Sequence, residues 1–494
     1  VPSGGIERVE VPDSDRLQPT LSALQIQELS EMARSLEDLF GGPQDIEFAV
    51  ADNTVHLLQS RPITTLDTSD DVDWEEGLDT SRTWSLVRLS ALKGPVYRLQ
   101  LDFGLVYMDN MRLCYQETAS MMSRGHLIHQ ANGYVFTSPP DDDPAIVAQR
   151  QQRQAEKCKA YIDQGTTNYL EEMVPKINQI HADLRKLRSV GTSIQARVNY
   201  LVKCIDAAGF IMGHLHWCMI DRANQLDWPA EFHNITGEPA EDSDVFLQAI
   251  PNRTTRLVSR LRNLARLVRE DPVLASAFAE GSFEVLESPQ HQNRPNARIF
   301  STQFRAMMKE YGFRTGWGFG SGVTFEHPTW NMALSKPLEL IASYAQQDID
   351  HLESMEARAL KQRQLLTRRI RRKLADRPDQ LDKFEFTRKR AQSDVARMED
   401  HNYLMEQSTV GQMREAMHLM GESLVKTGLI EDPADVLHIS LDELKQLADG
   451  HGPDNVRSLV TQRADERDRL AKLTPPATLG KPPQPTNADQ PEDS

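Results

Sequence analysis

The stretch "GGPQDIEFAVADNTVHLLQSRP" at residues 41–62 decides how the start of the chain folds. "DIEFAV" alternates apolar and polar residues, "ADN" is a turn-forming cluster, and Pro62 ends a second run, so the pattern predicts a β-hairpin. Apolar residues also recur at three-and-four spacing from Ser22 to Phe40, just before two glycines. This spacing predicts a helix that leads into the hairpin.

Three polar side chains in this hairpin, Glu47, Gln59 and Arg61, are unusual for a purely structural element. Gln59 and Arg61 share a face of their strand, and Glu47 joins them only if the turn has an odd number of residues, such as 51–53. A carboxylate, an amide and a guanidinium that converge suit a metal-bound nucleoside triphosphate. The spacing alone favours the alternative, an exposed hairpin with ordinary surface polar groups.

Composition limits the class of protein. A chain of 494 residues is long enough for roughly two to four domains. The net charge of -16 argues against a nucleic-acid surface, and four cysteines without a CxxC pair predict free thiols in a reducing cytoplasm. The most apolar stretch, residues 198–220, contains Lys203 and Asp206 and predicts a buried helix rather than a membrane span.

Periodicity predicts a mainly α protein, in which a small α/β piece precedes a large helical central domain. We expect one short β segment within the helical part, at residues 132–140. The expected domains are the α/β piece at 1–66, an acidic linker at 67–94, the helical domain at 95–445, a closing helix at 446–473, and a proline-rich, disordered linker or tail at 474–494.

"LEDLFGGPQDIEFAV" followed by "VHLLQSRPIT" closely resembles the end of the ATP-grasp domain in the phosphoenolpyruvate synthase and pyruvate phosphate dikinase superfamily, which includes rifampin phosphotransferase and phenylphosphate synthase. The resemblance implies that ATP and Mg²⁺ are cofactors. It implies that Glu47 is a metal ligand, and that Gln59 and Arg61 contact nucleotide and phosphate. "YGFRTGWGFGSGVTFEHPTW" (311–330) and residues 397–444 likewise resemble the helical central domain of that superfamily.

The resemblance implies a dikinase-type reaction, in which ATP phosphorylates a mobile histidine and the histidine passes its phosphoryl group to a small organic acceptor. The acceptor would be pyruvate-like or an aromatic alcohol. We expect the first half of the ATP-grasp domain and the phosphohistidine domain to lie elsewhere in a full-length chain or on separate subunits, so that this chain alone is inactive. The alternative is a non-catalytic helical subunit or adaptor derived from the same superfamily.

The glycine-rich segment at 312–322 lacks the lysine of a phosphate-binding loop and favours a flexible turn. Arg314, His327 and Trp330 lie around this turn. From the resemblance, we expect these three residues to line an acceptor pocket.

"EDHN" at 399–402 places two carboxylates beside His401. A carboxylate can orient an imidazole and raise its basicity, which makes His401 a candidate catalytic general base. A helix cap with a surface charge pair explains the same residues equally well. His214 and Cys218 share a helical face, but two ligands do not make a zinc site, so a core histidine is the favoured interpretation.

Overall fold

The computed structural model describes residues 20–40, 44–51, 54–62, 72–87, 94–118, 126–139, 143–149, 151–152, 169–223, 226–288, 293–315, 327–453 and 455–482. The chain divides into two compact units. One consists of Val1–Val72 with Lys472–Pro476, and the other of Asp73–Ala471 with Ala477–Ser494. Both contain helices and small antiparallel sheets, and helices dominate, which confirms the predicted mainly α fold class.

The first unit contains a helix and a hairpin, as the sequence predicted. Helix α1 spans Ala23–Phe40, and strands β1 (Gln44–Ala51) and β2 (Thr54–Pro62) pair in antiparallel fashion. Ser22 caps the helix, because its hydroxyl accepts a hydrogen bond from the Gln25 amide at 3.3 Å while the Gln25 side chain accepts one from the Ser22 amide at 2.9 Å. The cap explains why the helix begins where the apolar period begins.

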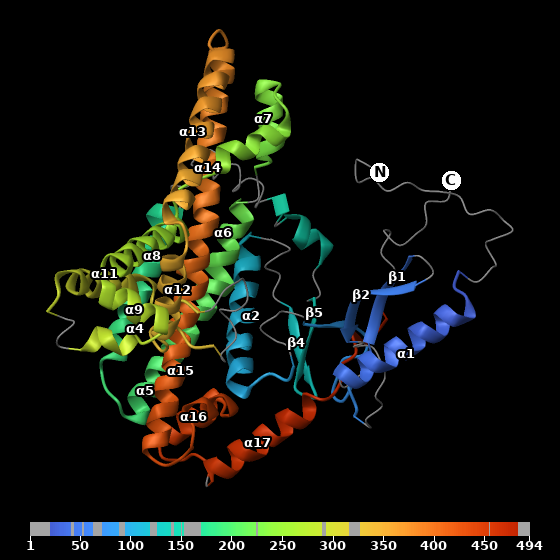
Figure 1. Ribbon diagram of the computed structural model, residues 1–494. Coiled ribbons are helices and arrows are strands. Elements are labelled where there is room, and N and C mark those ends of the chain that lie inside the picture. The colour runs from blue at the N-terminus through green and yellow to red at the C-terminus, as the bar shows by residue number, and fades with distance from the viewer. Residues whose placement is uncertain are drawn as a thin grey trace. The chain divides into compact units, whose positions relative to one another are not determined.

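The second unit is a helical assembly (Figure 1). Among the described residues, its α-helices include α2 (Arg98–Thr118), α4 (Val174–Arg188), α5 (Ile194–Ala208), α6 (His216–Ala223), α7 (Trp228–Thr236), α8 (Arg253–Glu270), α9 (Pro272–Glu280), α11 (Pro295–Tyr311), α12 (Ser335–Gln346), α13 (Ile349–Lys373), α14 (Pro378–His401), α15 (Ser408–Lys426), α16 (Leu441–Ala448) and α17 (Val456–Leu470). Its π-helical segments are η3 (Tyr169–Met173), η4 (Gly209–Leu215) and η7 (Asn402–Gln407), and its 3₁₀ segments are η5 (Ala240–Leu247), η6 (Phe283–Glu287) and η8 (Pro433–His438).

A four-stranded antiparallel sheet accompanies these helices. It contains β3 (Thr83–Leu86), β4 (Leu127–Ala131), β5 (Tyr134–Ser138) and β6 (Thr478–Gly480), in the order β4-β5-β3-β6. Asn132 and Gly133 connect β4 to β5 and both have positive φ, 48° and 80°, as a tight two-residue hairpin turn requires. Strand β5 confirms the short β segment that the sequence predicted.

Two segments that the sequence predicted to be linkers contribute strands to this sheet. Strand β3 lies within 67–94, and β6 lies within 474–494. Trp84 and Leu479 pair across β3 and β6 and are both buried. Burial of one large apolar side chain per strand outweighs the polar and proline-rich composition of the surrounding residues. Residues 483–494 of the expected tail lie outside the described part of the chain.

Helices α14 and α15 follow one another along one axis, joined by η7, as the orange ribbon in Figure 1 shows. Every residue from Ser408 to Met417 in α15 is buried. A helix that is buried on all sides must lie at the centre of its domain. Apolar clusters surround it, one with α2, α5 and η8, and another between α8, α11 and α12 that includes Tyr403 of η7.

The most apolar stretch of the chain, residues 198–220, forms part of α5, all of η4 and part of α6. Its apolar side chains belong to the clusters around α15 and η7, whereas Lys203 and Asp206 form an exposed ion pair. This confirms the predicted buried helix. Within the described ranges, no helix combines the length and the hydrophobicity that crossing a membrane requires.

Gly411 lets α15 approach the segment that follows α11. A Cβ atom at this position would lie 2.2 Å from the Phe313 carbonyl oxygen. We therefore expect Gly411→Ala to lower the free energy of unfolding by about 1–3 kcal/mol, because backbone atoms would have to move apart. Thermal or urea denaturation followed by circular dichroism measures this change.

Gly104 of α2 provides the matched control, because a Cβ atom there would meet no atom within 4 Å. Gly104→Ala is expected to stabilise the protein by about 0.5–1 kcal/mol, since alanine restricts the unfolded chain and favours a helix. Equal effects of the two substitutions would contradict the close approach at Gly411.

The start of α16 is tied to α17 by an ion pair. Both oxygens of Glu443 accept hydrogen bonds from Arg463, at 2.7 and 2.8 Å, and this contact lowers the pKa of Glu443 to about 2. A carboxyl whose pKa is lower in the folded state contributes stability above its unfolded pKa and loses it as the pH falls. Glu443→Gln should lower the thermal midpoint at pH 7, with a difference from wild type that shrinks between pH 4.5 and pH 2.

Asp442→Asn is the control for this pH series, because the neighbouring Asp442 side chain is 83% exposed and pairs only with Lys445 among the described residues. Exposed pairs of this kind contribute little to stability. The Asp442 variant should therefore follow wild type at every pH. A pH-independent difference for Glu443→Gln would show that lost packing, not lost charge, causes its effect.

Candidate functional site

The turn of the first hairpin differs from the predicted one. Ala51 pairs with Thr54, so the turn contains two residues rather than three. With this turn and regular pairing throughout, Glu47 would face away from Gln59 and Arg61, because a shift of one residue moves a side chain to the other face of the sheet. A turn with an odd number of residues is therefore not what places Glu47 on the same face as Gln59 and Arg61.

A β-bulge restores the alignment. The register shifts between Glu47 and the next residue of β1, which leaves Leu58 of β2 without a cross-strand partner. Beyond the bulge, Gln59 lies directly opposite Glu47, and Arg61 lies opposite Asp45. The structure thus brings the carboxylate, the amide and the guanidinium to one face of the hairpin.

The three side chains on this face are accessible. Arg61 forms an ion pair with Glu47, and their side chains are 54% and 52% exposed. Gln59 is also exposed. An ion pair between exposed side chains contributes little to stability, so either group can exchange its partner for a phosphate oxygen or a metal ion at small cost.

The residues on this face fit a magnesium ion that is shared with a nucleotide. Mg²⁺ prefers oxygen ligands and is usually held by one or two carboxylates, several waters and substrate phosphates. Glu47 supplies one carboxylate, and Asp45 supplies a second two residues earlier on the same face. Arg61 offers a planar guanidinium that matches phosphate oxygens.

In the helical unit, Arg314, His327 and Trp330 line one cavity of about 510 Å³. The structure therefore brings together the three residues that were expected to form an acceptor pocket. The opposite walls are mostly apolar and come from α8 and α12, through Leu257, Val258, Leu261, Leu340 and Tyr344. Lys336 and Glu339 of α12, which form an ion pair at 3.3 Å, also line the cavity. The cavity thus combines a large apolar surface with Arg314, a histidine and this ion pair.

The guanidinium of Arg314 is held in place from two sides. Its Nε donates a hydrogen bond to the Gln407 side chain at 2.8 Å, and it lies 5.9 Å from the centre of the Tyr403 ring. Burial lowers the pKa of Arg314, because desolvation disfavours its charged form. An anionic or strongly polar group of a ligand would compensate this lost hydration.

The segment that carries Trp330 is fixed by buried polar contacts. The Trp330 amide donates to the Arg314 carbonyl at 2.8 Å. On either side of it, the Thr329 hydroxyl and the Asn331 amide group donate to one carboxylate oxygen of Glu415, at 3.2 and 2.9 Å. Glu415 belongs to the buried part of α15, so the central helix positions this wall of the cavity.

His401 is buried, but the carboxylates beside it in the sequence do not face it. Asp400 accepts a hydrogen bond from the backbone amide of Arg253 at 2.6 Å and lies 3.7 Å from the Arg256 guanidinium, so it binds the start of α8. The cap expected at these residues themselves is not formed, because they end α14 and continue into η7, and the N-cap residue of α8 is Asn252. The carboxylate that faces His401 belongs to Glu406, with 3.9 Å between His401 Nε2 and Glu406 Oε1.

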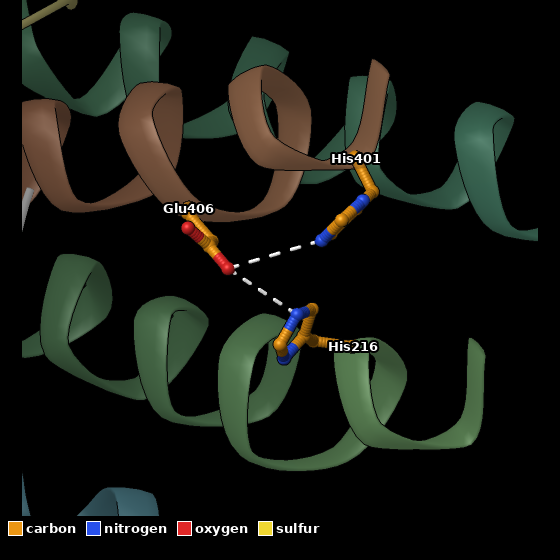
Figure 2. A group of neighbouring side chains, drawn as sticks. All are labelled: His216, His401 and Glu406. Carbon is orange, nitrogen blue, oxygen red and sulfur yellow. Dashed lines mark ion pairs between the residues drawn. The ribbon is translucent and has the colours of Figure 1, made fainter. Parts of the chain in front are cut away.

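A second histidine completes this cluster (Figure 2). The Nε2 atom of His216 lies 3.3 Å from the same oxygen of Glu406. The rings of His216 and His401 stack with their centres 5.1 Å apart. All three residues are less than 9% exposed, and they come from two elements, α6 on one side and the α14–η7 junction on the other.

The pKa of His401 is lowered to about 4, first because burial disfavours the charged ring and then because His216 is close. The ring is therefore neutral at neutral pH and carries a free lone pair. A group with this pKa is a weak general base near pH 7, since proton transfer is most effective when the pKa lies near the working pH. The catalytic role of His401 stays a prediction.

The π-helical turn of η7 explains why sequence spacing missed Glu406. His401 and Glu406 are five residues apart, which in an α-helix separates their side chains by roughly 140° around the axis. The i→i+5 hydrogen bonds of a π-helix bring such a pair to one side. The Gln407 side chain donates to the Asn402 side chain at 2.8 Å across the same five-residue interval.

The sequence also gave no prediction for His216, although His216 lies between His214 and Cys218, which their helical spacing had singled out. His214 is half-buried against the Phe210 ring, and the Cys218 sulfur lies 3.3 Å from the sulfur of Cys114. Within the described residues, neither His214 nor Cys218 joins the cluster of His216. Regular α-helical spacing gave no reason to single out His216, the histidine that does face His401 and Glu406.

Comparison with known proteins supports the interpretation of both units. Residues 2–81 match the family model described as pyruvate phosphate dikinase, AMP/ATP-binding domain, a range that contains the whole hairpin. Residues 214–398 match the model described as rifampicin phosphotransferase fourth domain. This second range contains Arg314, His327 and Trp330.

Curated relatives show the same similarity. A rifampicin phosphotransferase of Streptomyces sp is 24% identical over 526 residues, which is 97% of this chain and 57% of the relative. The uncharacterized phosphotransferase YvkC of Bacillus subtilis (strain 168) is 32% identical over 153 residues, 28% of this chain and 18% of that protein. A probable phosphoenolpyruvate synthase of Methanothermobacter thermautotrophicus is 48% identical over 63 residues, 13% of this chain and 9% of the relative.

The matches thus span between 9% and 57% of the length of these three relatives. The two family models together cover more than half of this chain, and they fall on the segments whose motifs carried the resemblance. The chain belongs to the superfamily of phosphoenolpyruvate synthase, pyruvate phosphate dikinase and rifampicin phosphotransferase.

Proposed function

We propose that the chain is part of an ATP-dependent, dikinase-type phosphotransferase, to which it contributes Mg-ATP ligands and the acceptor-binding domain. The observation that carries this proposal is the convergence of Glu47, Gln59 and Arg61 on one exposed face, within the range that matches an AMP/ATP-binding domain. In the reaction, ATP and a water molecule react with a mobile histidine to give phosphohistidine, AMP and phosphate, and the phosphohistidine then transfers its phosphoryl group to the hydroxyl oxygen of a small organic acceptor.

In this proposal the hairpin residues bind and orient the triphosphate. The guanidinium of Arg61 forms a bidentate contact with phosphate oxygens, Gln59 donates its amide to the nucleotide, and Glu47 turns from Arg61 to hold Mg²⁺. The metal ion, when bound, neutralises charge on the transferring phosphoryl group. Positioning and charge compensation do most of the work in such transfers.

The phosphohistidine and the remaining phosphate ligands would come from elsewhere in a longer chain or from separate subunits. We place the reaction in the cytoplasm, where cysteines stay reduced. The thiols of Cys114, Cys204 and Cys218 are buried and form no disulfide, which is compatible with that compartment.

The cavity of the helical unit favours an acceptor with an apolar or aromatic body. Its volume of about 510 Å³ and the apolar walls from α8 and α12 exceed what a pyruvate-sized molecule can cover. Arg314 and His327 would face the polar group of the acceptor. An aromatic alcohol fits these walls better than pyruvate does.

Nucleotide binding tests the role of the hairpin. In the complete assembly, which supplies the remaining phosphate ligands, ATP should bind in a Mg²⁺-dependent manner in isothermal titration calorimetry. Arg61→Ala should weaken this binding by about tenfold or more, equivalent to about 1.4 kcal/mol, because a phosphate contact is lost. Glu47→Gln should weaken binding only when Mg²⁺ is present, because it removes a metal ligand rather than a phosphate contact.

His56→Ala is the matched control, since His56 is exposed on β2 near the turn and away from Glu47 and Arg61. This variant should bind Mg-ATP like wild type. If Arg61→Ala and Glu47→Gln also behave like wild type, the nucleotide role of this hairpin is wrong. The non-catalytic helical subunit or adaptor would then be the better description of the chain.

An anionic aromatic probe tests the cavity. Anilinonaphthalene sulfonate, with an apolar ring system and one negative group, should bind to wild type with enhanced fluorescence, because apolar walls and Arg314 meet in this cavity. Val258→Trp places a bulky ring in the cavity from α8 and should weaken binding about tenfold.

Ser259→Trp is the matched control, because Ser259 is the next residue of α8 and is exposed rather than part of the cavity lining. It adds the same ring outside the cavity and should leave probe binding unchanged. Equal affinities of the two tryptophan variants would show that the probe binds elsewhere and that this cavity is not its site.

A further inference from the structure

The cluster of His216, His401 and Glu406 has the composition and geometry of a metal site. Figure 2 shows a nitrogen of each imidazole ring directed toward the same carboxylate. One ligand atom from each residue can be chosen so that all three lie within 4.8 Å of one another. We propose that these three residues bind a divalent transition-metal ion of the Zn²⁺ type inside the helical unit.

The distances are close to those of a tetrahedral site. Bonds of about 2.0–2.2 Å from zinc to nitrogen and oxygen place neighbouring ligand atoms roughly 3.3–3.5 Å apart. The His216 Nε2 to Glu406 Oε1 distance is 3.3 Å, and the corresponding distance for His401 is 3.9 Å. To bind one ion, His401 would have to move closer to Glu406, and the two stacked rings would have to turn until a nitrogen of each faces the ion.

Because Glu406 is buried, a bound cation would stabilise its carboxylate. Glu406 is 8% exposed, and within the described part of the chain it has no lysine or arginine within ion-pair distance. A buried carboxylate without a lysine or arginine partner keeps much of its desolvation cost. His216 Nε2 is buried and lies 3.3 Å from Glu406 Oε1 without the alignment of a hydrogen bond. A dication would compensate the carboxylate and use the imidazole lone pairs.

The ligand types select the class of ion. Two imidazoles with one carboxylate suit Zn²⁺ and related first-row dications such as Fe²⁺, whereas Mg²⁺ and Ca²⁺ prefer sets made of oxygen atoms. This site is therefore chemically distinct from the hairpin face with Glu47, which offers oxygen ligands. The inference does not depend on the proposed phosphotransferase function, because it rests only on the helical unit.

The ligand set leaves a coordination position open. No further histidine, cysteine, aspartate or glutamate among the described residues joins the group. Three protein ligands with a free position that water can fill are typical of zinc sites that interact with a ligand, while structural sites usually have four protein ligands. The next residue of η7, Gln407, lines the acceptor cavity, so the ion would lie one residue from that wall.

The backbone around the cluster is fixed by close packing. Gly213 of η4, three residues before His216, lies so close to α2 that a Cβ atom would be 2.6 Å from the Tyr107 carbonyl oxygen. On the other side, η7 holds Glu406 beside His401. Two π-helical segments therefore flank the ligands, and such segments occur frequently at functional sites.

Metal analysis of the full-length chain tests the proposal. Protein purified without chelators, or dialysed against Zn²⁺ and then against metal-free buffer, should contain about one equivalent of metal by plasma mass spectrometry. Glu406→Gln and His216→Ala should each lower the affinity for Zn²⁺ at least tenfold, because each removes one of three ligands. Iron in place of zinc in the purified protein would support the same site.

His418→Ala is the matched control. His418 and Glu422 form a histidine–carboxylate pair at 3.5 Å on α15, but both side chains are about 40% exposed, and no second histidine joins them in the described part of the chain. This variant should retain one equivalent of metal. Loss of metal in His418→Ala, or its retention in Glu406→Gln, would place the ion elsewhere and overturn the proposal.

A gain of signal separates ligand loss from misfolding. Co²⁺ bound to wild type should give visible ligand-field bands, and Glu406→Cys should add a thiolate-to-cobalt charge-transfer band, which a merely structural role of Glu406 would not produce. Circular dichroism monitors folding of each variant. The proposal is overturned if wild type holds substoichiometric metal and shows no cobalt bands. It is also overturned if Glu406→Cys binds cobalt without the new band.

Discussion

The helix that runs from α14 through η7 into α15 is the constraint on which the helical unit depends. Because residues 408–417 of α15 are buried on every side, their polar groups need partners, and neighbouring elements supply them for Glu415. The π-helical turn of η7 changes which way successive residues face, so that the helix presents Glu406 to the histidine cluster and Gln407 to the cavity. A regular α-helix through these positions would separate His401 from Glu406.

Buried charge on the same helix organises the cavity wall. Glu415 accepts hydrogen bonds from Thr329 and Asn331 through one oxygen and pairs with Arg188 at 3.0 Å through the other. Burial raises the pKa of Glu415, and these partners oppose that effect. Removal of one partner would leave a buried carboxylate partly unpaired, which costs more than an ordinary hydrogen bond contributes. The segment with Trp330 is therefore held in one position relative to α15.

Patterns that depend on regular periodicity were predictable from the sequence, and departures from regular periodicity were not. Alternation predicted the first hairpin and three-and-four spacing predicted α1, and both elements form there, although apolar side chains such as Ile26, Phe40 and Phe48 are exposed. The bulge at Leu58 and the π turn of η7 each shift the register by one residue without a distinctive composition. For this reason the sequence pointed to Arg61 and His401 as candidates, whose roles stay predictions, but gave the wrong turn for the hairpin of Arg61 and the wrong carboxylates for His401.

The two candidate cation sites differ in the exposure of their carboxylates, and exposure affects how fast each ion would exchange. Glu47 is half-exposed and shares its charge with Arg61, so an ion there can arrive with a nucleotide and leave with it. Glu406 is buried between two imidazoles that come from separate elements, so an ion there has no open route through exposed ligands and would exchange slowly. Such a resident ion would join α6 to η7, and because Gln407 of η7 orients Arg314, the ion would also stabilise the polar side of the acceptor cavity.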